Sequence, residues 1–517
     1  MEVESLLSSA HQHQINKRWS DALLSYDMIL REHPDEPRAV FGIAQIAKRC
    51  GQQALALQLL SKIIRLYPEH ARALECRGQL LKQLNNPLAA ITDISKAIDL
   101  GLQSPELYNT RGVIFAQLGK FDQAIEDFTA AINRHNQFAD AFYNRALAYR
   151  KTKNYLEAIA NYTATIRLKP DHFQAYNNRG FAYRELGRFN DAIKDFIKSS
   201  KINGQFHEGY WNASLGLLAI GEYEKGWRLY EYRWSSASFT SPRRNFPAPI
   251  WLGKESLNGK TILLHSEQGL GDTLQFCRYV PLVEKLGGQV ILEVEKPLIG
   301  ILQSLSRKVQ IIEKSTPLPD FDYHCPLMSL PLAFATTLET IPSKCPYLTV
   351  NESRVKFWKA KLGSAEKPRV GVVWRGNSAH ANDFNRSISL HYIVTILSPE
   401  IDWISLQKDP SPEETETLKK TTKINNLGDV FTDFAETGAI CKSMDAILSV
   451  DTSIAHLGGA LGVPVFLLLP YIADARWFLD RNDSPWYPNT NIFRQTPHRD
   501  WTRPIQEANR EIIKMFK

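Results

Sequence analysis

The sequence repeats itself every 34 residues from Val3 onward, and this period constrains the fold more than any other feature. Seven copies follow one another without an insertion. The eighth residue of each copy is small: Ala10, Ala44, Gly78, Gly112, Ala146, Gly180 and Ser214. The twentieth is also small: Ala22, Ala56, Ala90, Ala124, Ala158, Ala192 and Gly226. Because antiparallel helices approach closely only where side chains are short, each copy is predicted to be a helical hairpin.

Large apolar residues recur at the twenty-fourth position and predict contacts between successive hairpins. They are Tyr26, Leu60, Ile94, Phe128, Tyr162, Phe196 and Tyr230. The whole pattern resembles the tetratricopeptide repeat. The resemblance implies that residues 1–240 form an all-α superhelix with a groove that holds a peptide or partner protein. Stacked hairpins of this kind bury one continuous core.

Two polar columns of the repeat raise functional questions. Arg77, Arg111, Arg145 and Arg179 occupy the seventh position, and the same copies carry Asp93, Asp127, Asn161 and Asp195 at the twenty-third. Because the two columns change together, we interpret them as structural partners across each hairpin rather than as an anion-binding ladder. The sixth position carries Asn144, Asn178 and Asn212. Their amides are candidates for holding an extended peptide backbone, although asparagine is also a common residue of the repeat.

The second half of the chain has a different pattern. After Pro242, Pro247 and Pro249, short apolar runs such as Thr261–His265 and Ala446–Val450 alternate with amphipathic stretches. Such alternation predicts parallel sheets covered by helices on both faces. We expect two doubly wound lobes, residues 241–365 and 366–517, with a C-terminal helix and a cleft between the lobes. Ligands of such sheets bind beyond the carboxyl ends of the strands.

The first of these strands ends in His265-Ser-Glu-Gln-Gly-Leu-Gly-Asp272. Gly269 and Gly271 allow a tight turn and a close approach to a ligand. Asp272 is expected at the start of a helix, where its carboxylate either caps the helix or faces the cleft.

A second motif, Asp451-Thr-Ser-Ile-Ala-His456-Leu-Gly-Gly, follows the strand Ala446–Val450. Asp451, Thr452 and Ser453 are expected to begin a helix whose free N–H groups suit a diphosphate. His456 falls on the first turn.

A third segment runs from Trp374 through Gly376, Asn377 and His380 to Arg386 and Ser387. It is polar and cationic, as a phosphate-facing loop would be, and Arg386 is suited to a pyrophosphate. A further polar loop contains Asp474 and Arg476, to which we assign no role.

Two of these motifs, Gly269–Asp272 and the one that begins at Asp451, resemble in this order the heptosyltransferase-like glycosyltransferases of family nine. That resemblance implies a GT-B fold and inverting transfer of a sugar from a nucleotide-diphosphate donor, with no catalytic metal and no cofactor. Asp272 would then be the general base. By the same resemblance, Asp451, Thr452, Ser453 and His456 would line the donor side. The loop from Trp374 to Ser387 differs from the family's usual donor loop, and we add further donor or phosphate candidates on their own chemistry: Gly269, Gly271, Trp374, Gly376, Asn377 and Arg386.

The fused repeats resemble those of protein O-linked N-acetylglucosaminyltransferases. This implies a polypeptide or carrier-linked glycan as the acceptor, presented by the repeats. The alternative is a non-catalytic repeat adaptor whose α/β half senses a nucleotide or is inert.

Composition limits the other possibilities. Lys and Arg total 62 against 55 Asp and Glu, and the excess forms no cationic stripe, so nucleic acid is not expected as a partner. No apolar stretch is long enough to span a membrane, and no signal peptide is visible. The six cysteines show no metal-ligand spacing. We therefore expect a cytoplasmic protein.

Overall fold

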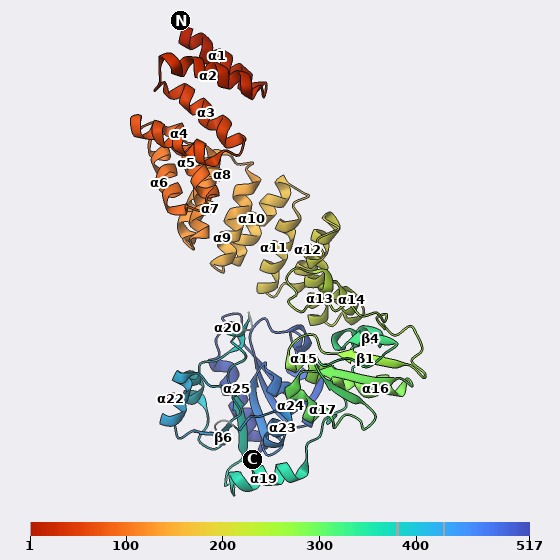
Figure 1. The fold of residues 1–517 in the computed structure, drawn as a ribbon. Helices are drawn as coiled ribbons and strands as arrows, with labels where there is room; N and C mark the ends of the chain where they lie inside the picture. Colours follow the sequence, from red (N-terminus) through yellow and green to blue (C-terminus); the bar gives the residue numbers. More distant parts are fainter. Residues whose placement is uncertain (1, 365, 379–381, 428–429) are drawn as a thin grey trace. The chain divides into compact units, whose positions relative to one another are not determined.

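The computed structural model describes residues 2–364, 366–378, 382–427 and 430–517. The chain divides into two compact units, residues 1–183 and 184–517, and the division falls within helix α11. The repeats are all helical, as predicted, and the α/β region follows them (Figure 1). No helix in the described ranges is both long and apolar enough to cross a membrane.

Each repeat forms two antiparallel helices of 8–14 residues. In the first unit they are α1 (Glu2–Ile15), α2 (Trp19–Glu32), α3 (Pro37–Arg49), α4 (Gln53–Leu66), α5 (Ala71–Gln83), α6 (Pro87–Asp99), α7 (Pro105–Gln117), α8 (Phe121–Arg134), α9 (Ala139–Lys151), α10 (Tyr155–Leu168) and α11 (Phe173–Glu185). In the second unit they are α12 (Phe189–Ile202), α13 (Glu208–Ala219) and α14 (Tyr223–Tyr230).

The small residues lie where the helices cross, as predicted. A Cβ atom on Gly78 would lie 2.7 Å from the Ile94 side chain and 3.2 Å from the carbonyl oxygen of Ala90. Gly112 meets Phe128 in the same way, at 2.8 Å. The eighth residue therefore packs between the twentieth and twenty-fourth residues of its own hairpin. A larger side chain would force the helices apart.

The arginine column is structural, as interpreted from the sequence. Arg77 donates to both carboxylate oxygens of Asp93 at 2.7 and 2.8 Å, and Arg111 does the same to Asp127 at 2.8 and 2.7 Å. Arg111 also donates to Ser95 of the preceding repeat at 3.0 Å. The guanidinium thus joins the two helices of one hairpin and ties that hairpin to its neighbour.

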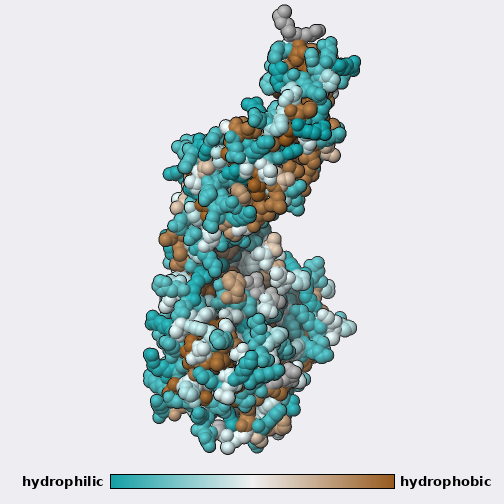
Figure 2. Space-filling model, turned by 90° about the vertical axis from the view of Figure 1, so that its left-hand side faces the viewer, coloured by the Kyte–Doolittle hydropathy of each residue, from teal (hydrophilic) through white to brown (hydrophobic). Residues whose placement is uncertain are grey.

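The solenoid also exposes apolar side chains on the second helices of its hairpins. Leu24, Leu88 and Leu156 belong to this group. Figure 2 shows brown apolar surface along the repeats in the upper part of that view.

The α/β region contains two parallel sheets. The first has the strand order β3-β2-β1-β4, with β1 (Thr261–His265), β2 (Gln289–Val294), β3 (Gln310–Glu313) and β4 (Tyr323–Pro326). The second has the order β10-β11-β9-β8-β5-β6-β7. Its strands are β5 (Arg369–Val373), β6 (Asp402–Ser405), β7 (Ile424–Asn426), β8 (Ala446–Val450), β9 (Val465–Leu469), β10 (Asp483–Ser484) and β11 (Tyr487–Arg494). Among the strands that the structure describes, only β10 is antiparallel to its neighbour.

The helices of this region cover the two sheets (Figure 1). They are α15 (Leu270–Phe276), α16 (Val280–Lys285), α17 (Ile299–Leu302), α18 (Leu330–Ala333), α19 (Glu352–Leu362), α20 (Asp383–Arg386), α21 (Leu390–Ile396), α22 (Pro412–Lys420), α23 (Phe434–Cys441), α24 (Ser453–Leu461) and α25 (Thr502–Met515). Short 3₁₀ helices are η1 (Glu231–Ser235), η2 (Cys277–Tyr279), η3 (Lys296–Leu298), η4 (Leu327–Ser329) and η5 (Ala475–Trp477).

The last repeat belongs to the core of the α/β region. Tyr223 of α14 accepts a hydrogen bond from Trp486 Nε1 at 3.0 Å, and Trp227 packs edge-on against Phe276 of the first lobe. These residues share one buried apolar cluster with both sheets. The last hairpin, which lies before the boundary expected at residue 240, thus packs with the α/β region. The boundary between the lobes is likewise bridged by this common core.

Candidate functional site

Asp272 is the third residue of α15, which begins where the loop after β1 ends. Its Oδ2 atom accepts a hydrogen bond from the backbone N–H of Gly269 at 2.9 Å. The carboxylate thus closes the first turn of the helix, as the capping interpretation requires. Gly269 is the N-cap residue, with an extended backbone.

The other oxygen of Asp272 contacts the second lobe. Oδ1 accepts from Nη2 of Arg476 at 2.5 Å. Arg476 lies in η5, beyond the carboxyl end of β9, and also donates to Asp474 at 2.9 Å and to Gln275 at 2.7 Å. Both side chains of the Asp272–Arg476 pair are mostly buried, at 15% and 13% exposed. Asp272 thus caps its own helix through Oδ2 and forms an ion pair with Arg476 of the second lobe through Oδ1.

Helix α24 begins directly beside this ion pair. Its N-cap residue, Thr452, has an extended backbone and makes no side-chain cap. The N–H groups of Ser453 and Ile454 have no hydrogen-bond acceptor in the part of the chain that the structure describes. Free N–H groups at a helix N-terminus attract anions.

Glycines set how closely α24 packs. A Cβ atom on Gly458 would lie 2.8 Å from Ile447 of β8, and one on Gly459 would overlap the ring of Tyr487. Gly462 ends the helix in a left-handed conformation, with φ 72°. The helix therefore lies close against the sheet.

The N-termini of α15 and α24 pack against each other (Figure 1). A Cβ atom on Gly271 would lie 2.7 Å from the His456 ring and 3.5 Å from the α-carbon of Ser453. The expected gap between Asp272 and the helix N-terminus is thus closed at this point. Gly271 contributes by letting the lobes touch.

His456 is buried beneath these helix starts. Its Nδ1 lies 2.9 Å from the Tyr487 hydroxyl, and its ring stacks on Trp477 with centroids 5.3 Å apart. Nε2 lies 3.5 Å from Nη1 of Arg476, which can only donate. Burial, followed by the charge of Arg476, lowers the pKa of His456 well below its usual value. The imidazole is therefore neutral.

Asp451 precedes α24 and has an unusual protonation equilibrium. Burial raises its pKa from 3.8 to about 6, and the negative charge of Asp474 acts in the same direction. Its carboxylate lies 3.9 Å from Nε2 of His456. Asp451 thus gains or loses its proton within an accessible pH range.

Arg386 reaches the same place from the loop after β5. Its Nη1 donates to the backbone carbonyl of Asp451 at 2.9 Å, and its Nε to Asp383 at 3.2 Å. Gly376 leaves room for this pair, because a Cβ atom there would lie 2.5 Å from Asp383 and 2.6 Å from Arg386. Asn377 lies beside Gly376 and is exposed. His380 and its two neighbours, residues 379–381, lie outside the described residues.

The expectation that Trp374 lines the donor side is wrong for its side chain. Trp374 is fully buried in the apolar cluster of the second sheet, and its Nε1 donates to Glu414 at 2.7 Å. An indole is a large apolar group, and here burial determined its position.

The three asparagines of the repeats have different environments. Asn144 donates to Asn109 at 3.0 Å and Asn178 to the Tyr143 hydroxyl at 2.9 Å, so each is held by the preceding repeat. Both remain partly exposed. Asn212 is buried, which contradicts its place among the groove candidates. Its position in the packed last repeat explains the burial.

Sequence reasoning missed two groups around the site. The first is Arg476 with Asp474, and their position after the most apolar strand was the available signal. The second is Arg233 of η1, which is fully buried and donates to both carboxylate oxygens of Glu267 at 3.1 and 3.0 Å. Burial raises the pKa of Glu267 to about 7, against the charge of Arg233. Because Glu267 precedes Gly269 by two residues, this pair ties the end of the repeats to the Asp272 loop.

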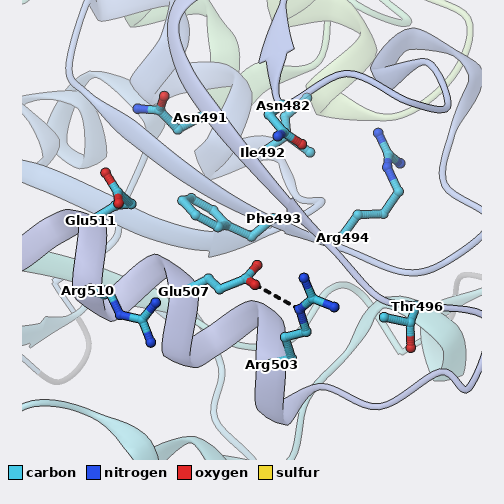
Figure 3. Close-up of a pocket in the computed structure, with 10 residues that line it drawn as sticks. All are labelled: Asn482, Asn491, Ile492, Phe493, Arg494, Thr496, Arg503, Glu507, Arg510 and Glu511. Carbon is cyan, nitrogen blue, oxygen red and sulfur yellow. Dashed lines mark hydrogen bonds and ion pairs between the residues drawn. The ribbon is translucent and has the colours of Figure 1, made fainter.

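A separate pocket of about 600 Å³ lies between β11 and α25 (Figure 3). Arg503 and Glu507 of α25 form an ion pair at its wall. Arg494 lines it and donates to the carbonyl of Trp477 at 3.0 Å. The pocket thus shares no residue with the Asp272 and α24 cluster, but Arg494 connects it to the ring that stacks on His456.

The described residues contain no group of three His, Cys, Asp or Glu side chains placed to hold a metal ion.

Comparisons with known proteins define the class of the N-terminal half. Models described as tetratricopeptide repeat match residues 16–71, 76–140, 109–162 and 173–206, and a model described as TPR repeat matches residues 147–187. Residues 16–71 and 76–206 therefore consist of tetratricopeptide repeats, and an α/β region with parallel sheets follows them.

One curated relative extends the comparison. Protein FlbA of Caulobacter vibrioides is 28% identical over 309 residues, which covers 55% of this chain and 51% of FlbA. The chain thus spans about half the length of this curated relative.

Solved structures resemble the repeats. MamA is 25% identical, with a TM-score of 0.32, over 33% of this chain and 92% of its own. YrrB, described as a TPR protein with an unusual peptide-binding site, is 17% identical, with a TM-score of 0.33, over 35% of this chain and 92% of its own.

Proposed function

We propose that the chain is an inverting glycosyltransferase of the GT-B type, which moves a sugar from a nucleotide-diphosphate donor to an acceptor presented by the repeats. The acceptor is a polypeptide or a carrier-linked glycan. The observation that carries the proposal is the uncapped N-terminus of α24, which has Arg386 on one side and Asp272 of the other lobe beside it.

The diphosphate is the part of the donor that this arrangement suits best. The N–H groups of Ser453 and Ile454 lack acceptors in the described residues and lie where the helix dipole is positive. Arg386 adds a full positive charge within 2.9 Å of the carbonyl that precedes the helix. Amides and a guanidinium fixed in advance stabilise a leaving diphosphate as its charge grows, so the proposed reaction proceeds without a metal ion.

Asp272 is the group suited to remove the acceptor proton. In the proposed step, an acceptor hydroxyl gives its proton to the carboxylate while its oxygen bonds to the anomeric carbon of the sugar. The bond from that carbon to the diphosphate oxygen breaks, and the electron pair leaves with the diphosphate. One base opposite the leaving group is sufficient for inversion.

A binding measurement tests the donor assignment first. Thermal unfolding of the full chain with UDP-, GDP-, ADP- and dTDP-sugars is expected to show a rise in Tm with at least one of them. Arg386→Ala should weaken binding of that nucleotide diphosphate by about tenfold, because a charge-assisted contact is lost. Absence of a shift with every donor would favour the adaptor interpretation.

Turnover tests the base. Asp272→Asn is expected to lower sugar transfer or donor hydrolysis by about 10²–10⁴-fold, with donor affinity changed less than about threefold. The matched control is Asp320→Asn, an exposed carboxylate in the same lobe. Full turnover in Asp272→Asn would remove Asp272 as the base.

A further inference from the structure

Arg476 links the two lobes through its guanidinium. The group donates to Asp272 and Gln275 of α15, to Asp474 of its own loop, and approaches His456 of α24. We infer that Arg476 is the positioning residue that orients the Asp272 carboxylate for proton removal. This inference rests on the proposed function.

The geometry of the guanidinium makes this role specific. Nη2 bonds to Asp272, and Nη1 bonds to Gln275, one helical turn later on the same face of α15. Nε donates to Asp474 of the same loop, and this bond holds the guanidinium in place. A planar group with five donors can satisfy these three directions at once, whereas an ammonium group on a flexible chain cannot.

The carboxylate of Asp272 is not saturated by protein hydrogen bonds in this arrangement. Gly269 N–H occupies one site on Oδ2 and Arg476 one site on Oδ1. Since each carboxylate oxygen can accept two hydrogen bonds, an open position remains on each. The two protein donors thus fix the plane of the carboxylate and leave it able to accept a proton.

The charges around Arg476 favour a guanidinium at this position. Burial lowers the pKa of Arg476, but the carboxylates of Asp474, Asp272 and Asp451 outweigh this effect and raise it. Without the guanidinium, these three carboxylates would lose the positive charge that they share. Asp272 would then lose its fixed orientation through repulsion as well as through the lost hydrogen bond.

The kinetic test compares Arg476→Lys and Arg476→Met with the control Arg481→Lys. Arg481 is an exposed arginine five residues further on, paired with Asp483. Both Arg476 variants should lower kcat about 100-fold while the donor KM changes less than about threefold, because a misplaced base slows the chemical step without weakening donor binding. A raised donor KM with unchanged kcat would assign Arg476 to the donor and overturn the inference.

Chemical rescue separates orientation from general structural support. Guanidinium ion at tens of millimolar should restore part of the kcat of Arg476→Ala and leave the Arg481→Ala control unchanged. No rescue, together with a kcat in Arg476→Lys equal to that of the wild type, would overturn the role.

A double variant distinguishes failure of this inference from failure of the proposed function. If Arg476 acts through Asp272, then Asp272→Asn and Asp272→Asn/Arg476→Met should have equal residual turnover. If Asp272→Asn is inactive and Arg476→Met is fully active, only the inference fails. If Asp272→Asn is fully active, or if the wild type turns over no donor, the proposed function fails and Arg476 loses the role with it.

Discussion

The pairing of Arg111 with Asp127 allows a sharp test of how the repeats are stabilised. Arg111→Ile removes the guanidinium and leaves the carboxylate of Asp127, which is 6% exposed, without its two hydrogen bonds. The second repeat shows the natural alternative, because it carries Ile43 and Leu59 at the same two positions. The double variant Arg111→Ile/Asp127→Leu reproduces that apolar pair.

The structure sets the expected magnitudes. Leaving one partner of a buried ion pair alone costs about 3–5 kcal/mol, whereas replacing both by apolar residues is close to neutral. An exposed pair of similar length, Lys169 with Asp140 at 2.7 Å, provides the control. Its side chains are about half exposed, so Lys169→Met should cost less than about 1 kcal/mol.

Hydrogen exchange of the intact chain measures these effects locally. In Arg111→Ile, amides of α7 and α8 should exchange roughly a hundred-fold to a few thousand-fold faster, since each 1.4 kcal/mol is a factor of ten. The double variant should recover most of this protection. If it is as labile as the single variant, or if the single variant exchanges like the wild type, the structural interpretation of the arginine column is refuted.

Two further predictions concern the α/β region. Burial and the charge of Asp474 raise the pKa of Asp451 to about 6, so ionisation costs the folded state stability as pH rises from about 4 to 6. Asp451→Asn should therefore gain up to about 3 kcal/mol over the wild type at pH 8 and nothing at pH 4, which thermal unfolding at both pH values would check. Gly459→Ala should lower stability by about 1–3 kcal/mol because its methyl group overlaps the ring of Tyr487. Gly204→Ala, where nothing lies within 4 Å, is the control, and equal Tm values for the two variants would contradict the packing argument.

The repeat half could be predicted closely because its information is local and repeated seven times. Gly78 and Gly112 are small for a reason visible in the sequence, since the residues they meet lie 12 and 16 positions further on. The pairing of Arg77 with Asp93 was also visible in the sequence, because copies with arginine at the seventh position carry Asp or Asn at the twenty-third. The prediction that Asn212 lines the groove was wrong because its repeat packs against the α/β region. The repeat period carries no information about that contact.

The strands of the α/β half were predicted where they are long and apolar. Thr261–His265 and Ala446–Val450 appear as expected. Tyr323–Pro326 and Tyr487–Arg494 were missed, because each contains a proline and the second also contains two asparagines. Their pairing with buried neighbours overrides these local preferences.

The site was predictable at the level of motifs and not of partners. The motifs identified Asp272 and the start of α24, and the structure brings them together. Arg476 was passed over because a lone arginine in a loop is usually solvated. Only the fold shows that the loop after β9 reaches α15 of the other lobe, 204 positions earlier in the chain. Trp374 was misassigned because adjacency to a polar loop does not decide on which face of a strand a side chain lies.

The packing of α14 has a practical consequence for rebuilding this protein. The last helix of the repeats also contributes to the core of the α/β region, through Tyr223, Trp227 and Tyr230. A chimaera that exchanges the repeat array for a foreign one should therefore be joined near Arg184, with the last hairpin retained. Grafting at residue 240 would remove the aromatic rings of α14 from the α/β region. The apolar surface that they cover would then be exposed to solvent and prone to aggregation.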